Sequence, residues 1–425
     1  MAFRQMTRAD LFLIITLLSE TLLIAATWPL WTQAGPFPAV PCMSAAAGVS
    51  IFIDRMLLIG LLGAMLFVAG RLFWRRNAET ETTDQVRQDG VLKIGLLAAL
   101  LSAAALTILN QHRLQAWHWL FMLLLVQKIL IPRAELLRLW RLSVAVIYIF
   151  AAVSRLGPDV AQGMSREVVY VLAGWTGLHQ FVKSEPNLFV VCLLLTLAEL
   201  AVGVVLAVGR IRRVGVISAM VLHGTLILVL SPLGLNHHPG VLGWNLYFLL
   251  AVPVLFGLSN RAEGTGEPQQ RAVSLRSRVM ICGVVLFPLS GLCGLADNWL
   301  SWQLYSPRPE VVRVFVHLEA VHRLPPAVRP FVGQPPPLSD WCPVRIDRWS
   351  LADTGSPVYP EDRFQLAVAG FLMTQAADGD LRAELDAPQV PGWWHRRVSE
   401  FRSSEALQQR QKQFYLNSEV IRTGD

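Results

Sequence analysis

The stretch LFVVCLLLTLAELAVGVVLAVG, residues 188–209, decides the class of this protein. It carries a single charged side chain, Glu199. A helix of this length spans about 33 Å, and the hydrocarbon core of a bilayer is about 30 Å thick. The stretch therefore predicts a transmembrane helix.

Other apolar runs of similar length surround this one. Hydrophobic residues make up 53% of the chain and charged residues 16%, with a mean hydropathy of +0.45, whereas soluble domains are about a quarter charged. We expect an all-α polytopic bundle of nine transmembrane helices. The other eight predicted spans are 11–31, 52–73, 91–109, 116–132, 138–156, 214–231, 241–258 and 279–296.

Two segments leave alternatives open. The run 11–31 follows Arg4 and Arg8, so a cleaved signal sequence is the alternative to a first span. The stretch 168–182 is only half apolar, which favours a helix lying at the membrane interface over a further span.

Basic residues are distributed unevenly between alternate loops. With the N-terminus in the cytoplasm, eighteen Lys and Arg residues fall on the inner side of the first 296 residues and five on the outer side. Cytoplasmic loops carry such an excess, so we expect a cell-membrane protein with its C-terminus outside. The basic pI is thus a signal of topology and gives no reason to expect a nucleic-acid partner.

The composition changes after residue 296. We therefore divide the chain into a transmembrane domain, 1–296, and a soluble extracytoplasmic domain, 297–425. The second has Pro-rich breaks and an alternating β-branched run, which is typical of a small α+β domain. We expect strands at 311–317 and near 382–385, and helices at 362–373 and 404–415.

Ionisable side chains inside spans are costly and are functional candidates for that reason. Glu20, Glu199 and His223 are predicted near mid-membrane, where a buried polar pair that holds helices together is the alternative. His and Asn residues also gather at the predicted outer ends of the spans, which an aromatic belt does not explain. No His-x3-His or Cys-x2-Cys spacing predicts a metal site. A polar pocket that opens to the outside, or a transport pathway, remains.

Five short motifs over residues 90–260 resemble a known superfamily. They are Asn110-Gln-His112, Tyr148-Ile-Phe-Ala-Ala-Val-Ser-Arg155-Leu156 with Gly163, Leu197-Ala-Glu199-Leu-Ala-Val-Gly203, Leu222-His223 and Gly243-Trp-Asn245-Leu-Tyr-Phe. Their order is similar to that in the HTTM and vitamin K-dependent γ-carboxylase superfamily. The nine predicted spans and the external C-terminal domain agree with this resemblance.

The resemblance implies roles for individual residues. It implies that His112 and His223 are proton-transferring groups, and the imidazole pKa suits that role. It also implies a quinone as a cofactor. Arg155 stands where the carboxylases carry a lysine base, and a guanidinium does not act as a base at neutral pH. We expect Arg155 to bind an anion, or alternatively to pair with Asp159 at a helix end. The residues expected to bind substrate are Asn110, Arg155, Asn245 and Glu199.

Cys42 and Cys342 are the two cysteines outside the predicted spans, and both are predicted on the oxidising side of the membrane. A disulfide between them is one hypothesis, and two unpaired thiols are the other. The sequence cannot test the Cα separation that a bridge requires.

Two functions remain open at this point. The first is a membrane protein whose outward-facing pocket acts on a lipid, a quinone or an exported polypeptide, either as a carboxylase-like or quinone-linked enzyme or without catalysis. The second is a non-enzymatic transporter or an assembly factor whose external domain binds a partner. Inverted repeats and broken helices, which favour a transporter, are not evident in the sequence.

The charge bias makes a prediction about topology. Alkaline phosphatase fused after Asp425 should be active because it is exported, and a fusion within 79–89 should be inactive because it stays in the cytoplasm. Reporter activity in whole cells measures both. The reverse pattern would place the C-terminal domain on the cytoplasmic side.

Overall fold

The structure is a computed structural model that describes residues 7–74, 82–208, 211–257, 273–377, 379–389 and 395–420, with side chains of the fourth helix from 89 onward. Residues 209 and 258, the predicted ends of two spans, lie outside these ranges. So do six of the basic residues assigned above to the inner side. These six are Arg4, Arg75, Arg76, Arg210, Arg261 and Arg271.

The fold is mostly helical, and eight of its described helices are long and apolar enough to cross a membrane. The chain is thus that of a multi-pass membrane protein. These eight helices are α1 (Arg8–Ala26), α3 (Ile51–Trp74), α4 (Thr82–Leu109), α6 (Arg133–Arg155), α9 (Glu185–Val208), α10 (Arg212–Leu230), α11 (Pro239–Phe256) and α12 (Leu275–Leu292).

The predicted span 116–132 corresponds to a shorter apolar helix, α5 (Ala116–Leu130). Its 15 residues reach about 22 Å, less than the thickness of the hydrocarbon core. Eight long helices are therefore observed among the described residues where nine spans were predicted.

Proline and glycine end two segments earlier than predicted. Helix α1 ends at Ala26, and a separate helix α2 (Trp28–Thr32) follows with Pro29 in its first turn. Proline has no N–H to continue the ladder of α1. The stretch 168–182 is likewise divided, because α7 (Gly163–Thr176) ends at Gly177, which has φ +74°, before the short α8 (His179–Val182).

The residues form two compact units. Unit 1 comprises 1–23, 62–100 and 119–307, and unit 2 comprises 24–61, 101–118 and 308–425. Helices α1, α3, α4 and α5 contribute residues to both units.

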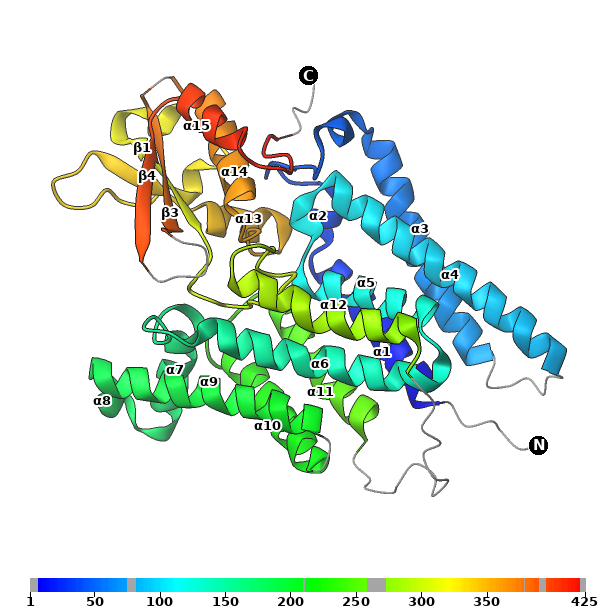
Figure 1. The fold of residues 1–425 in the computed structure, drawn as a ribbon. Coiled ribbons are helices and arrows are strands. Elements are labelled where there is room, and N and C mark those ends of the chain that lie inside the picture. Colours follow the sequence, from blue (N-terminus) through cyan, green and yellow to red (C-terminus); the bar gives the residue numbers. More distant parts are fainter. Residues whose placement is uncertain are drawn as a thin grey trace. The chain divides into compact units, whose positions relative to one another are not determined.

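In unit 1, helix α6 packs against α9, α9 against α10, and α10 against α11 (Figure 1). Two glycines permit close approach. A Cβ at Gly203 of α9 would lie 2.9 Å from Tyr148 Cβ of α6, and one at Gly215 of α10 would lie 2.9 Å from Val205 Cγ1 of α9. Small residues at helix contacts are the usual means of packing helices in membranes.

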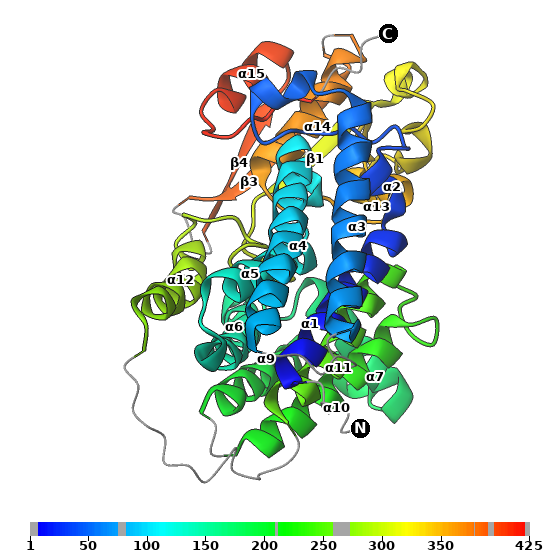
Figure 2. The same cartoon turned by 90° about the vertical axis from the view of Figure 1, so that its right-hand side faces the viewer.

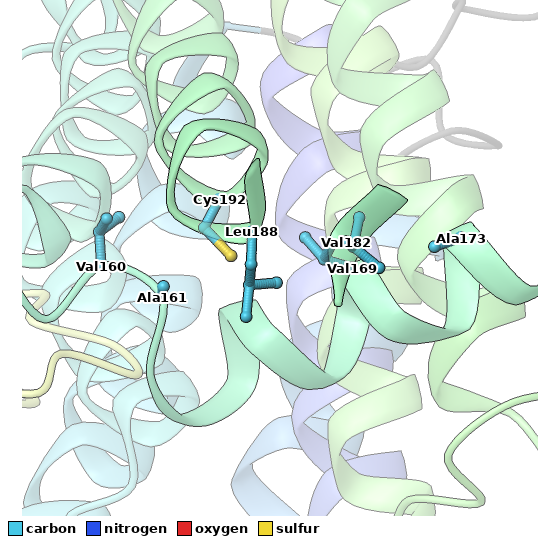
Figure 3. Close-up of a cluster of buried hydrophobic side chains, with 7 residues drawn as sticks. All are labelled: Val160, Ala161, Val169, Ala173, Val182, Leu188 and Cys192. Carbon is cyan, nitrogen blue, oxygen red and sulfur yellow. The ribbon is translucent and has the colours of Figure 1, made fainter. Parts of the chain in front are cut away.

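Helices α7, α8 and α9 share a small apolar cluster in unit 1 (Figure 3). Leu188 and Cys192, one turn apart on α9, are fully buried between Val169 of α7 and Val182 of α8. This burial anchors the two short helices to the first half of α9. The other members are Val160, Ala161 and Ala173.

Unit 2 contains a small antiparallel sheet near the C-terminus, ordered β2-β1-β3-β4. The predicted strands are confirmed as β1 (Val311–His317) and β3 (Leu381–Pro388). Strands β2 (Trp341–Val344) and β4 (Arg396–Phe401) were not predicted, because Pro343 and a pair of arginines obscure the strand pattern.

Helices complete unit 2. The predicted helix 362–373 is α14 (Asp362–Thr374), which packs on β1 and β3 (Figure 2). The other is α15 (Ser404–Gln411), shorter than 404–415 because the chain turns back and Ser418 Oγ donates to Gln411 O, 3.1 Å away. The remaining described elements are η1 (Ser44–Gly48), η2 (Gln111–Arg113), η3 (Leu318–Arg323), η4 (Arg329–Phe331) and α13 (Ile346–Thr354).

The close contact at Gly203 makes a prediction. Gly203→Ala should destabilise unit 1 by about 1–3 kcal/mol, because the new methyl group overlaps Tyr148 Cβ and Ile149 Cγ1. Thermal unfolding in detergent measures the loss. Gly224→Ala on α10 is the control, since a Cβ there meets nothing within 4 Å. Equal melting temperatures for the two variants would contradict the packing described.

Candidate functional site

The six predicted site residues fall into two groups. Asn110 and His112 belong to unit 2. The others belong to unit 1, and they are Arg155, Glu199, His223 and Asn245.

The first group lies in the turn between α4 and α5. Asn110 has an extended backbone and caps the single-turn helix η2, because its Oδ1 accepts the His112 N–H at 3.1 Å. All three residues of η2 are buried, although all are polar or charged. Such residues are buried only where their hydrogen bonds are satisfied.

Arg113 is completely buried, and all of its side-chain nitrogens are used. It donates to both carboxylate oxygens of Asp54, at 2.5 and 2.7 Å. Its other contacts are main-chain carbonyls: Leu30 O at 3.3 Å, Trp31 O at 2.9 Å and Leu106 O at 3.2 Å. The guanidinium thus joins α2 and the first turn of α3 to the end of α4.

Gln111 joins η2 to more distant segments of unit 2. Its Nε2 donates to Pro41 O at 2.9 Å and to Asn417 O at 2.7 Å, while its Oε1 accepts from Arg363 Nε at 2.8 Å. Arg363 belongs to α14, so the turn is tied both to the helix that covers the sheet and to the C-terminal segment.

His112 has one hydrogen bond that determines its tautomer. Its Nε2 lies 2.8 Å from Pro357 O, and a carbonyl oxygen only accepts, so Nε2 carries the proton and Nδ1 keeps its lone pair. The ring lies between Phe37 and Phe364, with centroids 5.5 and 5.2 Å away. Burial and the charge of Arg113 outweigh the bond to Pro357 and lower the pKa of His112 to about 4, so the imidazole is neutral at pH 7.

Asn110 and His112 line one pocket of about 140 Å³ in unit 2. The segment 35–39 forms much of its wall, and this segment is fixed by Asp353, whose carboxylate accepts from Phe37 N–H and from Trp349 Nε1. None of the described residues that line the pocket is charged. The lining is Pro29, Leu30, Gln33, Gly35, Pro36, Phe37, Pro38, Ala39, Asn110, His112, Thr354, Phe371 and Val420.

The second group contains a chain of three hydrogen-bonded side chains from α6, α10 and α11. His223 Nε2 lies 2.6 Å from Tyr148 Oη, and His223 Nδ1 lies 2.9 Å from Asn245 Oδ1. Asn245 Nδ2 donates to Val241 O at 2.9 Å. All three side chains are buried.

Arg155 and Glu199 form an ion pair between α6 and α9. The alternative partner Asp159 instead accepts from Gln162, so the expected pairing of Arg155 with Asp159 is wrong. The reason is that Glu199 faces α6 across the close contact made by Gly203, one turn further along α9. Arg155 Nε donates to Ala151 O as well, so an anion would compete with Glu199 for this guanidinium.

Some contacts of the candidate site residues were not predicted. Tyr148 begins one of the sequence motifs but was given no role, and Pro357 contributes only a carbonyl, which no side-chain pattern reveals. Asn245 is the hydrogen-bond partner of His223, a pairing that was not predicted. The signal for Tyr148 was available, because it lies two turns before Arg155 on one face of a predicted helix.

Of the two hypotheses for Cys42 and Cys342, the structure, which describes both residues, has the unpaired thiols and no bridge. Cys42 Sγ donates to Thr107 O at 3.4 Å, and Cys342 is buried in β2. Within the described residues no cluster of three His, Cys, Asp or Glu side chains could hold a metal ion.

Comparison with known proteins gives no match of the chain to a family model, to a curated protein or to a solved structure.

The buried His112 predicts a pH dependence. The unfolded chain binds a proton at His112 below about pH 6.5, and the folded protein binds it only near pH 4. The free energy of unfolding should therefore be highest above pH 6.5 and fall by about 3 kcal/mol on acidification to pH 4. Denaturant unfolding of unit 2 across this range measures the slope.

His112→Gln should reduce that slope, because glutamine keeps a donor but does not titrate. The exposed His322→Gln is the matched control and should leave the slope unchanged. An unaltered slope in His112→Gln would show that other groups cause the acid loss.

Proposed function

We propose that this protein is a multi-pass membrane protein of the HTTM type. Its N-terminus is cytoplasmic, it has nine spans when α5 is included, and its C-terminal residues are extracytoplasmic. The pocket beside His112 takes part of a membrane quinone or of an exported polypeptide. The order of the sequence motifs and the bias of basic residues support this proposal.

The observation that carries the proposal is the shared pocket of Asn110 and His112. Asn110 uses its Oδ1 for the cap of η2, which leaves the amide Nδ2 as a donor. His112 uses Nε2–H for Pro357, which leaves Nδ1 as an acceptor. A neutral imidazole with a fixed tautomer can accept a hydrogen bond from a bound hydroxyl group and is the one group among the described residues of this pocket that can take its proton, as a weak base with a pKa of about 4.

The size of the pocket limits the ligand. An apolar protein cavity of about 150 Å³ holds one benzene ring, and this pocket is close to that volume. It therefore fits the ring of a quinone or one side chain of a polypeptide better than the body of a two-chain lipid. Its uncharged lining favours a neutral ligand, because a charged group would lose its hydration without gaining an ionic partner.

Arg155 restricts the chemistry. It replaces the lysine base of the carboxylases and is engaged by Glu199. A carboxylase reaction that depends on a base at that position is therefore not part of the proposal. Proton transfer at His112 is the enzymatic step that this proposal retains.

A non-enzymatic assembly factor is the second candidate function. Leu338, which follows Pro335, Pro336 and Pro337, and the aromatic Tyr415 are fully exposed in unit 2. Exposed apolar side chains outside the candidate membrane-spanning helices favour contact with a partner protein.

Ligand retention tests the first proposal. Mild-detergent purification followed by mass spectrometry should recover a quinone or a peptide in molar amounts. Asn110→Ala and His112→Ala should each lower the recovered quantity about fivefold, because one lost hydrogen bond costs about 1 kcal/mol. His322→Ala, in the same unit and exposed, should retain the wild-type amount.

Two results would reject this assignment of the pocket. One is wild-type protein that carries neither a quinone nor a peptide at any detergent concentration tested. The other is equal retention by all three variants. A co-purifying protein lost on Leu338→Asp would then favour the assembly factor.

A further inference from the structure

The hydrogen bonds that join Tyr148, His223 and Asn245 have a defined donor and acceptor at each step. Asn245 Nδ2 donates to Val241 O, so the oxygen of this amide is the atom that faces His223. Because that oxygen only accepts, His223 Nδ1 must carry the ring proton. His223 Nε2 is then unprotonated, and the hydrogen bond of 2.6 Å to Tyr148 is donated by the tyrosine hydroxyl.

The imidazole is also held in place by its surroundings. Phe248 stacks on the His223 ring with centroids 5.0 Å apart and planes 11° apart, and Trp244 meets Phe248 edge-on. Tyr148 meets both the His223 and the Phe248 rings edge-on, at 5.6 Å each. A ring fixed by packing and by two hydrogen bonds cannot turn to exchange its nitrogens.

Burial disfavours the charged imidazole of His223, and a neighbouring negative charge offsets part of this effect. Glu199 is close enough to act electrostatically on both Tyr148 and His223, and it pairs with Arg155 two turns after Tyr148 on α6. The side chains of Arg155 and Glu199 are 14% and 18% exposed, so this end of the polar group is not sealed. The buried imidazole therefore lies within electrostatic range of a partly exposed ion pair.

We propose that Tyr148, His223 and Asn245 form a proton-accepting site inside unit 1, with His223 as the acceptor, Tyr148 as the group that delivers the proton and Asn245 as the positioning residue. The hydroxyl proton of Tyr148 moves to His223 Nε2 as the tyrosine oxygen takes a replacement from an O–H acid, which is hydronium when no substrate is bound. One proton enters, His223 becomes imidazolium, and Tyr148 is unchanged. Asn245 keeps the Nδ1 proton throughout.

This site is distinct from the pocket of unit 2, so its test does not depend on a ligand there. Protein labelled with ¹⁵N-histidine is reconstituted in nanodiscs, and His223→Gln assigns the resonances. Wild-type His223 should show a protonated Nδ1 and an unprotonated, hydrogen-bonded Nε2. Tyr148→Phe should move the Nε2 resonance toward that of a free lone pair.

The rate of proton uptake separates a relay from a merely structural pair. After a light-triggered acid jump, infrared spectroscopy follows the protonation of His223. Tyr148→Phe should slow this step about tenfold or more, because it removes the delivering hydroxyl. Tyr247→Phe is the matched control, since Tyr247 is a buried tyrosine of the same aromatic cluster that bonds Thr16 instead.

Two results would overturn the proposal: the opposite tautomer of His223 in the wild type, or an uptake rate that Tyr148→Phe leaves unchanged. If Tyr148→Phe does not purify, 3-fluorotyrosine at position 148 retains the hydroxyl and its bond but makes it more acidic. A faster uptake then supports the relay, and an unchanged rate rejects it.

Discussion

The buried ion pair of Arg113 and Asp54 is the constraint on which the organisation of unit 2 depends. An uncompensated charge in this environment costs several kcal/mol, so the guanidinium holds its acceptors within a narrow geometry. Those acceptors come from α2, α3 and α4, and the pair therefore defines where these segments meet. The two residues before Arg113 then have little freedom, and they are the ones that face α14 and the pocket.

Unit 1 combines close helix packing with buried polar side chains. Helices α6, α9 and α10 approach closely because glycine occupies contact positions where a Cβ would meet the neighbouring helix. Gly203 and Glu199 lie one turn apart on α9 and face Tyr148 and Arg155 on α6. A polar chain can persist in an apolar bundle here because each of its members is a donor or acceptor for the next.

The sequence predicted those helices and strands whose physical environment requires a recognisable pattern of apolar residues. Hydrocarbon requires long apolar helices, and eight such helices were located from their runs alone. The alternation of Val312, Val314 and Val316 revealed β1, and the same rule failed for β4, whose arginines interrupt it. Helix ends were less accurate, because single residues such as Pro29 and Gly177 determine them.

The candidate site was predictable in its residues and not in its pairings. His112 and Asn110 were expected in one site because they are neighbours in the sequence, and they line the same pocket. Asp159 was the alternative partner for Arg155 because it is the carboxylate nearest to it in the sequence, but Asp159 accepts from Gln162. The ion pair of Arg155 with Glu199 and the hydrogen bond of His223 with Asn245 depend on which helices pack together. That information is distributed over whole helix faces and is absent from any short motif.

The acceptors of Arg113 and His112 have a consequence for how this site can change during evolution. Positions 30, 31, 106 and 357 supply their hydrogen bonds through main-chain carbonyls, so these acceptors do not depend on which side chain the position carries. Substitution pressure falls instead on the three donors of η2 and on Asp54. Distant relatives could therefore keep this hydrogen-bonding geometry while sharing few identical residues. Recognising them would require comparison of backbone structures as well as of sequences.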